Sequence, residues 1–178
     1  KRFKRVKSAI ADYWFFDKTY FPPEVYENYC APNRMLKDIV KFASKPGYQI
    51  VLGPRKHGKT PTGKKYTLWL LLTGKIKIAG VYAETLNKSS DILMDIAALA
   101  LYNHKIMNDF KPYFSQLNGN QFCFSLKLPS KYYSTFTSLK GHKYCASFSE
   151  GRSVRGYTHM FSRPEFLLGD DIETNESS

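Results

Sequence analysis

The sequence has few cysteines, no long apolar run and far fewer acidic than basic residues. Its three cysteines, Cys30, Cys123 and Cys145, lie far apart and form no Cys-x-x-Cys pair. This spacing disfavours a disulfide scaffold or a zinc site and is typical of a reducing compartment. No apolar stretch approaches the roughly 18–20 residues that a membrane helix requires. The basic start of the chain is not followed by the apolar segment of a secretory signal.

The chain carries a large excess of positive charge. Among 178 residues, 27 Lys and Arg stand against 15 Asp and Glu, which gives a formal net charge of +12. Such an excess favours a polyanionic partner, although many basic proteins merely have a solvated basic surface. Hydrophobic residues make up 43% of the sequence, enough for the core of a single domain and too many for a disordered tail.

The first half of the chain predicts an α/β protein. Residues 1–46 form an aromatic, mainly helical lead-in, with helical apolar spacing over residues 9–19 and 33–43. From residue 47 onward, strands and helices alternate, which is the pattern of a mainly parallel central sheet flanked by helices. The expected order is a buried strand over 48–52, a helix over 61–73, a strand over 75–83 and a helix over 91–102.

The second half favours a β-hairpin element followed by an acidic strand. Residues 121–128 alternate between apolar and polar side chains, as a strand with one buried face does. Residues 132–138 and 144–148 are also strand-like and are separated by Lys140-Gly141-His142, which predicts two adjacent hairpin strands. The last apolar run begins at Phe166 and ends in Asp170 and Asp171.

The strongest motif is Gly53-Pro54-Arg55-Lys56-His57-Gly58-Lys59-Thr60, which satisfies the phosphate-loop pattern G-x-x-x-x-G-K-[ST]. Its glycines allow a tight backbone path, and its amides together with the positive end of the following helix attract phosphate oxygens. Lys59 is expected to reach the β- and γ-phosphates of ATP, and the Thr60 hydroxyl to bind Mg²⁺. The alternative is a glycine-rich basic turn without a ligand.

The acidic end of the last apolar run supplies the second half of a nucleotide site. A buried strand that delivers a carboxylate to its end is what magnesium binding in this class of site requires. Asp170 is expected to hold Mg²⁺, mostly through water, and Asp171 or Glu173 to polarise the attacking water. The alternative is a surface acidic turn after a core strand.

A third candidate lies in Gly151-Arg152-Ser153-Val154-Arg155-Gly156. An arginine flanked by glycines can contact a phosphate or a neighbouring subunit, because a guanidinium stabilises charge on a transferred phosphoryl group. A basic hairpin turn explains the same spacing equally well. His57 lies inside the phosphate loop, and the other histidines (His104, His142 and His159) have no metal-ligand spacing.

Several segments together resemble the ATPase domain of phage terminase large subunits, the motors that package DNA into procapsids. The phosphate loop and the ending Arg163-Pro164-Glu165 with residues 167–173 resemble that family's loop and its Asp-Asp-Ile-Glu element. The aromatic segment 14–22, Glu84-Thr85, residues 103–110 and Ser153-Val154-Arg155-Gly156 resemble further elements of the family. Glu84 departs from the family's usual aspartate, and Lys56 replaces a glycine.

The resemblance implies an additional-strand (ASCE-type) P-loop NTPase fold. It implies hydrolysis of ATP with Mg²⁺, coupled to translocation of double-stranded DNA by a homo-oligomeric ring docked on the portal protein, with a terminase small subunit as a further partner. Arg55 then corresponds to a loop arginine that contacts the γ-phosphate, and Arg155 to a finger reaching the next subunit's ATP. The implied location is the bacterial host cytoplasm, and segment 16–21 is a region in which to look for adenine contacts.

Two broader interpretations fit the same motifs. One is another nucleic-acid-stimulated P-loop ATPase of helicase-like type, and the other is a module that binds a nucleotide or DNA without turnover. Because terminase large subunits continue beyond the acidic strand, we expect the 47–178 core to be a truncated domain and the chain to be part of a longer protein.

Overall fold

The protein is built around a five-stranded mixed sheet. The computed structural model describes residues 1–23, 32–45, 58–149 and 163–170. The strands lie in the order β2-β3-β4-β1-β5. β1 is parallel to both β4 and β5, whereas the β2–β3 and β3–β4 pairings are antiparallel. The bounds of the strands are β1 (Ile78–Ala83), β2 (Pro112–Asn118), β3 (Gln121–Leu126), β4 (Lys143–Ser149) and β5 (Phe166–Asp170).

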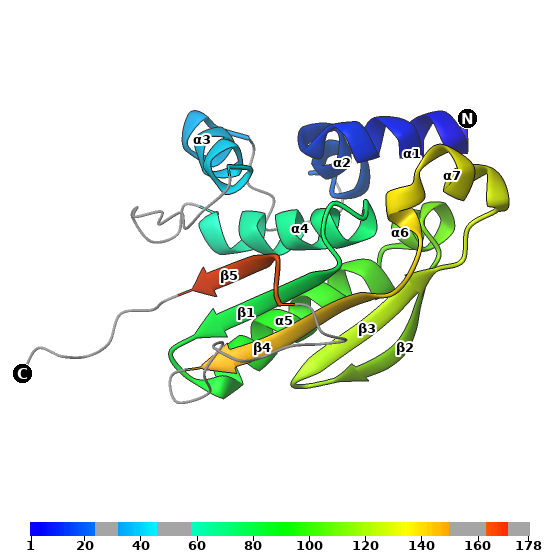
Figure 1. Ribbon diagram of the computed structural model, residues 1–178. Coiled ribbons are helices and arrows are strands. Elements are labelled where there is room, and N and C mark those ends of the chain that lie inside the picture. The colour runs from blue at the N-terminus through cyan, green and yellow to red at the C-terminus, as the bar shows by residue number, and fades with distance from the viewer. Residues whose placement is uncertain (24–31, 46–57, 150–162, 171–178) are drawn as a thin grey trace, which may run out of the picture.

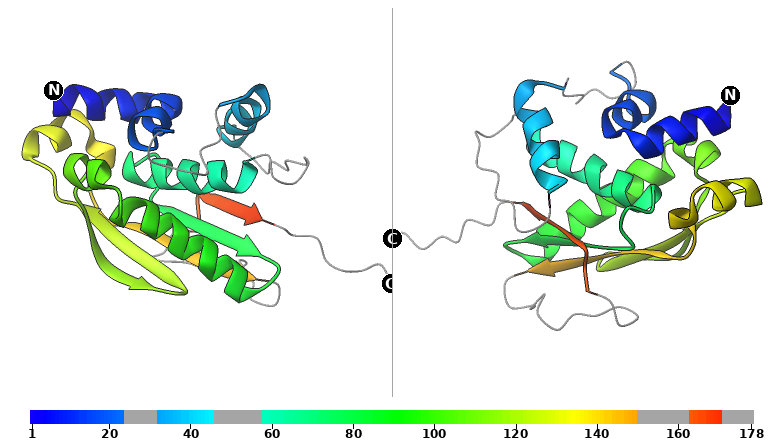
Figure 2. Two further views of the ribbon diagram at one scale, coloured as in Figure 1. Left: turned by 180° about the vertical axis from the view of Figure 1, so that it is seen from behind. Right: turned by 45° about the horizontal axis from the view of Figure 1, so that its top comes forward.

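The helices form layers over one face of this sheet. They are α1 (Arg2–Ala11), α2 (Tyr13–Tyr20), α3 (Arg34–Ala43), α4 (Lys59–Leu72), α5 (Leu86–Leu101), α6 (His104–Asp109), α7 (Ser130–Thr135) and the 3₁₀ turn η1 (Thr137–Leu139). In Figure 1, α4 lies against the sheet and α1, α2 and α3 lie above α4. The view from behind in Figure 2 shows α5 crossing the same sheet. Among the described helices, none has the length and apolar character needed to cross a bilayer.

α4 is the central helix of the core. Every residue from Lys65 to Leu72 in this helix is buried, because the sheet and α5 lie on one side of it and α2 and α3 on the other. A helix that is apolar almost all round is expected in such a position. The lead-in helices therefore share one hydrophobic core with the sheet, through side chains such as Val6, Phe16 and Tyr20.

The two faces of the sheet follow the alternation of its strands. In β1, Ala79, Val81 and Ala83 belong to the main core beneath α4 and α5. The other face carries a smaller apolar cluster of Ile78, Tyr144, Ala146 and Phe148. These observations confirm an α/β fold. Among the described strands, two of the four pairings are parallel, so this part of the sheet is mixed and not mainly parallel as expected. The strand expected over residues 48–52 lies outside the described residues.

A hairpin does precede the acidic strand, but its strands are not those predicted. β3 pairs with β2, and the turn between them is held by Asn118, whose side chain accepts hydrogen bonds from the amides of Asn120 and Gln121. Residues 132–138 are instead in α7 and η1. Their aromatic side chains pack on α1, where the rings of Phe3 and Tyr132 are 5.0 Å apart. This long-range packing overrides their strand propensity.

The lead-in differs from prediction in one further respect. The helix expected over residues 9–19 is split at Asp12, whose carboxylate accepts hydrogen bonds from the amides of Trp14 and Phe15 and so caps α2. The break lets α1 and α2 pack at an angle on α4. The second expected helix, by contrast, is confirmed as α3, capped by Asn33.

Lys143 is a fully buried lysine at the start of β4. Its ammonium donates to the backbone carbonyls of Lys140, at 3.0 Å, and Ser138, at 3.3 Å. Burial lowers the pKa of Lys143 to about 8, repulsion from Lys77 adds to the shift, and Glu165 opposes it. The lysine therefore links η1 to the sheet. The free-energy cost of burying its charge applies only at a pH at which the ammonium stays protonated.

This pKa predicts a stability that increases at alkaline pH. Between pH 8 and the ordinary lysine pKa of 10.5, the unfolded chain binds the Lys143 proton more tightly than the folded protein does. The free energy of unfolding therefore rises with pH across this window. From pH 7 to pH 10, urea unfolding should show wild type gaining about 2 kcal/mol relative to Lys143→Met. Equal pH dependence of the two proteins would contradict the assignment.

Candidate nucleotide site

The structure describes four of the residues predicted for the nucleotide site. Gly58, Lys59 and Thr60 lie at the start of α4, and Asp170 ends β5. Residues 53–57, which include Arg55, Lys56 and His57, lie outside the described residues. Arg152, Arg155, Asp171 and Glu173 also lie outside them, so their predicted roles stay predictions.

α4 begins directly after a glycine in a left-handed conformation. Gly58 adopts φ 74° and ψ 14°, a left-handed conformation that a side chain would strain. The helix begins at the next residue, so Lys59 and Thr60 occupy its first turn and are half-buried. Pro61 lies in the same turn, where it interrupts no intrahelical hydrogen bond, as the sequence predicts. A glycine cap supplies no side-chain acceptor, and an anion is the natural partner of such a helix end.

α4 and β5 run antiparallel and in close contact. A β-carbon on Gly63 would lie 2.7 Å from Leu168 Cδ1, so this glycine permits the close approach. One turn further along α4, the rings of Tyr66 and Phe166 are 5.9 Å apart. Later residues of the helix thus face earlier residues of the strand, which places Lys59 and Thr60 at the end of the sheet where Asp170 lies.

Three parallel strands end together beside this helix start. Ala83 of β1 is in register with Asp170 of β5 on one side and with Ser149 of β4 on the other. The chain after β1 turns at once into α5, whose cap is Thr85. Glu84 forms an ion pair of 2.6 Å with Lys88 in the first turn of α5. In open α/β sheets, ligands bind outside the carboxyl ends of the strands, and this is the edge at which β4, β1 and β5 end.

α2 holds the first two turns of α4 in place. The Tyr13 hydroxyl donates to the Thr62 carbonyl at 3.3 Å, and Lys65 forms a buried ion pair of 2.6 Å with Asp17. Burial raises the pKa of Asp17, while Lys65 opposes this shift. Lys65 also lies 5.5 Å from the centre of the Phe21 ring. The position of Lys59 and Thr60 therefore depends on a segment more than forty residues earlier in the chain.

A second buried carboxylate joins the lead-in to α6. Asp109 accepts two hydrogen bonds from Arg5, at 2.5 and 2.7 Å, and one from the Tyr20 hydroxyl at 2.8 Å. The hydrogen bond to Asp109 and the negative charge of this carboxylate raise the pKa of Arg5. The pKa of Tyr20 is raised mainly by burial and in addition by its hydrogen bond to Asp109. Asn103 caps α6 and donates to the Tyr20 carbonyl at 2.6 Å. The aromatic segment 14–22 thus contacts the segment 103–110.

The residues near these strand ends include the kinds of oxygen ligand that a magnesium ion prefers. Mg²⁺ prefers oxygen ligands and keeps several waters, so one hydroxyl and one or two carboxylates are enough. Thr60 offers the hydroxyl, and Asp170 belongs to the same edge of the sheet. Over the part of the chain that the structure describes, no three His, Cys, Asp or Glu side chains gather closely enough to hold a metal ion by themselves.

The two buried carboxylates, Asp17 and Asp109, and their partners were not predicted from the sequence. Asp17 lies at the same helical spacing as Tyr13 and Tyr20, and a charge in such an apolar register indicates a buried ion pair. Lys65 directly precedes the apolar run of α4 and carries the same signal. Neither pattern identifies the partner, since the two residues are far apart in sequence.

No protein-family model, no curated protein and no solved structure matches this chain.

Proposed function

We propose that the protein is a magnesium-dependent ATPase that binds ATP at the carboxyl ends of its parallel strands. The observation that carries this proposal is the left-handed Gly58 immediately before α4, with Lys59 and Thr60 in the first turn, at the edge where β5 ends in Asp170. A glycine-rich basic turn without a ligand would not need this sequence, this backbone conformation and this neighbouring acidic strand together. The proposed fold is that of a P-loop NTPase of ASCE type.

Each residue has a defined task in the proposed reaction. The amides of the loop 53–60 and the Lys59 ammonium hold the β- and γ-phosphates and stabilise the negative charge of the transition state. Bound Mg²⁺ supplies charge neutralisation between these phosphates, and Thr60 and Asp170 are the residues that would hold it. Asp171 or Glu173 orients the attacking water and accepts its proton. Arg55 and Arg155 are the proposed contacts to the transferred phosphoryl group.

We further propose the narrower function of a DNA-packaging motor of the terminase large-subunit type. Support comes from the contacts between segments that resemble that family: the aromatic segment 14–22 touches residues 103–110 and also holds α4. In this proposal, ATP hydrolysis drives double-stranded DNA into a procapsid in the host cytoplasm, with the portal protein and a small subunit as partners and a ring of identical subunits as the active assembly.

The catalytic carboxylate can be assigned by two conservative substitutions. We expect one of Asp171→Asn and Glu173→Gln to lower the rate of phosphate release about 100-fold or more while ATP binding is retained, because general-base contributions are of this size. Phosphate release and ATP binding should be measured on the same preparations. If both variants hydrolyse ATP like wild type, the assigned carboxylates are wrong. If wild type binds ATP but does not hydrolyse it even when assembled on DNA, a module without turnover is favoured.

A further inference from the structure

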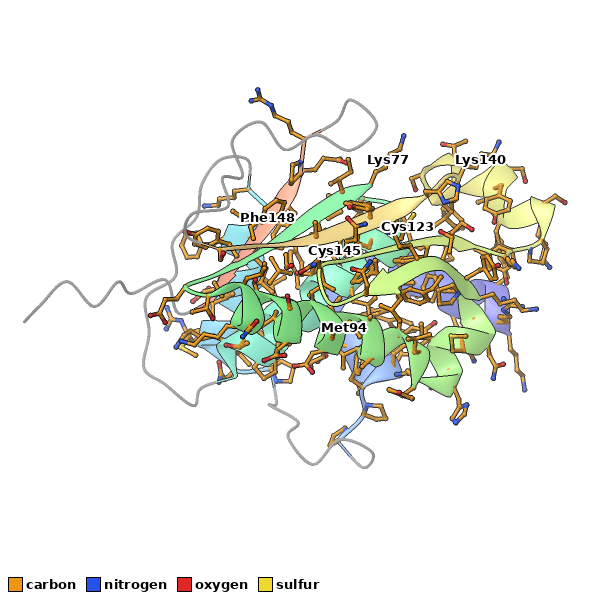
Figure 3. The ribbon with its side chains drawn as sticks, turned by 90° about the horizontal axis from the view of Figure 1, so that it is seen from below. Lys77, Met94, Cys123, Lys140, Cys145 and Phe148 are labelled. Atoms are coloured by element: carbon orange, nitrogen blue, oxygen red, sulfur yellow. The ribbon has the colours of Figure 1, made fainter. Side chains whose placement is uncertain are left out.

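Exposed lysines gather at the end of the sheet opposite to the proposed nucleotide site. Lys77 directly precedes β1, and Lys140 lies in the turn that leads into β4. Figure 3 shows Lys77 and Lys140 where β1 and β4 begin, with Phe148 at the far end of β4. Lys127 follows β3, whose end lies beside the start of β4 because Phe124 pairs with Lys143. We call Lys75, Lys77, Lys127, Lys131 and Lys140, all exposed, the amino-end lysine surface.

Direct contacts join the segments that carry these lysines. A β-carbon on Gly74 would lie 2.0 Å from the Ser138 carbonyl oxygen, and the Ser138 hydroxyl donates to the Thr73 carbonyl. The turn that carries Lys75 therefore packs directly on η1, next to Lys140. Lys131 lies 5.7 Å from the ring of Phe3 in α1, a helix with four basic and no acidic residues.

Little negative charge offsets this surface. Glu165 is the one exposed carboxylate that the described residues place beside these strand starts, and its Oε1 accepts from the amides of Lys77 and Ile78. The carboxylate of Asp109 is buried and bound by Arg5. A patch of like charges is costly in isolation and attracts a partner of opposite charge.

We propose that the amino-end lysine surface binds the phosphate backbone of double-stranded DNA without reading its bases. The lysines lie in two connections of the sheet, from α4 to β1 and from β3 to β4. The ammonium groups of Lys75 and Lys127 lie over the rings of Trp69 and Tyr113, at 4.9 and 3.5 Å from the ring centres. Positive charges that are spread over two connections suit a row of phosphates better than a single phosphate. Lysine is a flexible point charge, whereas base recognition relies on planar arginine, asparagine or glutamine side chains. Phosphate contacts of this kind position a protein on a duplex and carry no sequence information.

The surface is separated from the nucleotide site by the length of α4. This helix has 14 residues and at 1.5 Å per residue spans about 21 Å. Lys59 lies at its first residue and Lys75 follows its last turn. DNA and ATP can therefore bind at the same time. The choice of double-stranded DNA as the partner rests on the proposed function. The lysine surface itself does not, because it follows from the positions of the lysines in the fold.

The test is a charge reversal of three of these lysines. The full chain carrying Lys75→Glu, Lys77→Glu and Lys140→Glu is titrated with a fluorescent 30-base-pair duplex at several salt concentrations. Loss of three phosphate contacts should reduce the salt slope of log K by about 3 and raise the Kd by about 100-fold or more at 0.1 M salt. The Lys59→Ala variant should bind the duplex as wild type does, so that failure of the ATP site and failure of the DNA surface remain distinct.

The matched control carries Lys37→Glu, Lys41→Glu and Lys45→Glu, three exposed lysines of α3 and the turn that follows it. It changes the net charge by the same amount and should bind the duplex within about threefold of wild type, since charges elsewhere on the surface are largely screened at this salt concentration.

Equal losses of duplex affinity in both triple variants, or no duplex binding by wild type, would overturn the proposal. Tighter binding of a single strand than of the duplex would overturn the choice of partner. A second variant, with Lys75, Lys77 and Lys140 each replaced by glutamine, tests whether the charge-reversal variant loses affinity only because it misfolds. Its folding is checked by thermal unfolding, and it should show the same reduction in salt slope.

Discussion

Replacing Lys59 by alanine is expected to abolish ATP hydrolysis and to weaken ATP binding severely. Removing one partner of a buried, charge-assisted contact costs about 2–5 kcal/mol, which corresponds to about 30-fold to 4,000-fold in affinity. Lys59 stands in the first turn of α4, away from the tightly packed stretch that begins at Lys65, so the fold should tolerate its loss. The measurement is phosphate release at saturating ATP, with thermal unfolding as the check on folding.

The same helix offers a matched control for this variant. Lys64 lies five residues further along α4 and forms a surface ion pair of 2.6 Å with Asp95, whose side chain is 60% exposed. Lys64→Ala removes an equal charge from the same helix and should leave phosphate release within about twofold of wild type, because it removes no proposed phosphate contact. If Lys64→Ala and Lys59→Ala lose activity equally, the effect of Lys59 is one of charge or folding, and the assignment to the phosphates is wrong.

The ion pair between Asp17 and Lys65 should be among the most costly to break. Asp17→Ala leaves the Lys65 ammonium buried without its carboxylate, and such a change costs about 3–5 kcal/mol. For a chain of 178 residues, this corresponds to a fall in Tm of about 6–20 °C, measured by thermal unfolding. Because the pair also holds the first turns of α4, ATP affinity should fall as well.

Two further variants distinguish the effect of losing the ion pair from the effect of losing packing contacts. The double variant Asp17→Leu/Lys65→Met replaces both charges by apolar groups and should recover most of the stability, since buried pairs can be exchanged for well-packed apolar residues at little cost. Asp95→Ala, which removes the exposed pair on the same helix, should change the free energy of unfolding by less than about 1 kcal/mol. A double variant as unstable as Asp17→Ala would show that packing alone explains the loss.

Local signals in the sequence predict much of the architecture. α3 is observed where apolar spacing predicts it, over Arg34–Ala43. The helix expected over residues 61–73 is α4, which begins two residues earlier, at Lys59 directly after Gly58. The alternation of β3 and the apolar run of β5 also predict the observed strands. These features depend on interactions between near neighbours, which is why they can be inferred without knowing the tertiary contacts.

The remaining features depend on contacts between distant segments. Asp17 and Lys65 are 48 positions apart, and Arg5 and Asp109 are 104 apart, so no local pattern identifies either pair. Residues 132–138 have strand propensity but become helical where Tyr132 packs on α1. The position of β4 in the sheet could not be predicted either. β4 pairs antiparallel with β3 and parallel with β1, and the spacing of apolar residues in a strand does not indicate its neighbours or their directions.

The most direct measurement is a calorimetric titration of the full chain with ATP·Mg²⁺, for wild type, Lys59→Ala and Lys64→Ala in parallel. Binding does not require the neighbouring subunit that hydrolysis would need, so the titration tests the phosphate site by itself. We predict one site per chain with a Kd of about 1 µM to 1 mM, retained in Lys64→Ala and weakened at least about 30-fold in Lys59→Ala. Wild type that shows no binding at millimolar ATP, or Lys59→Ala that binds as tightly as wild type, would contradict the proposed nucleotide site.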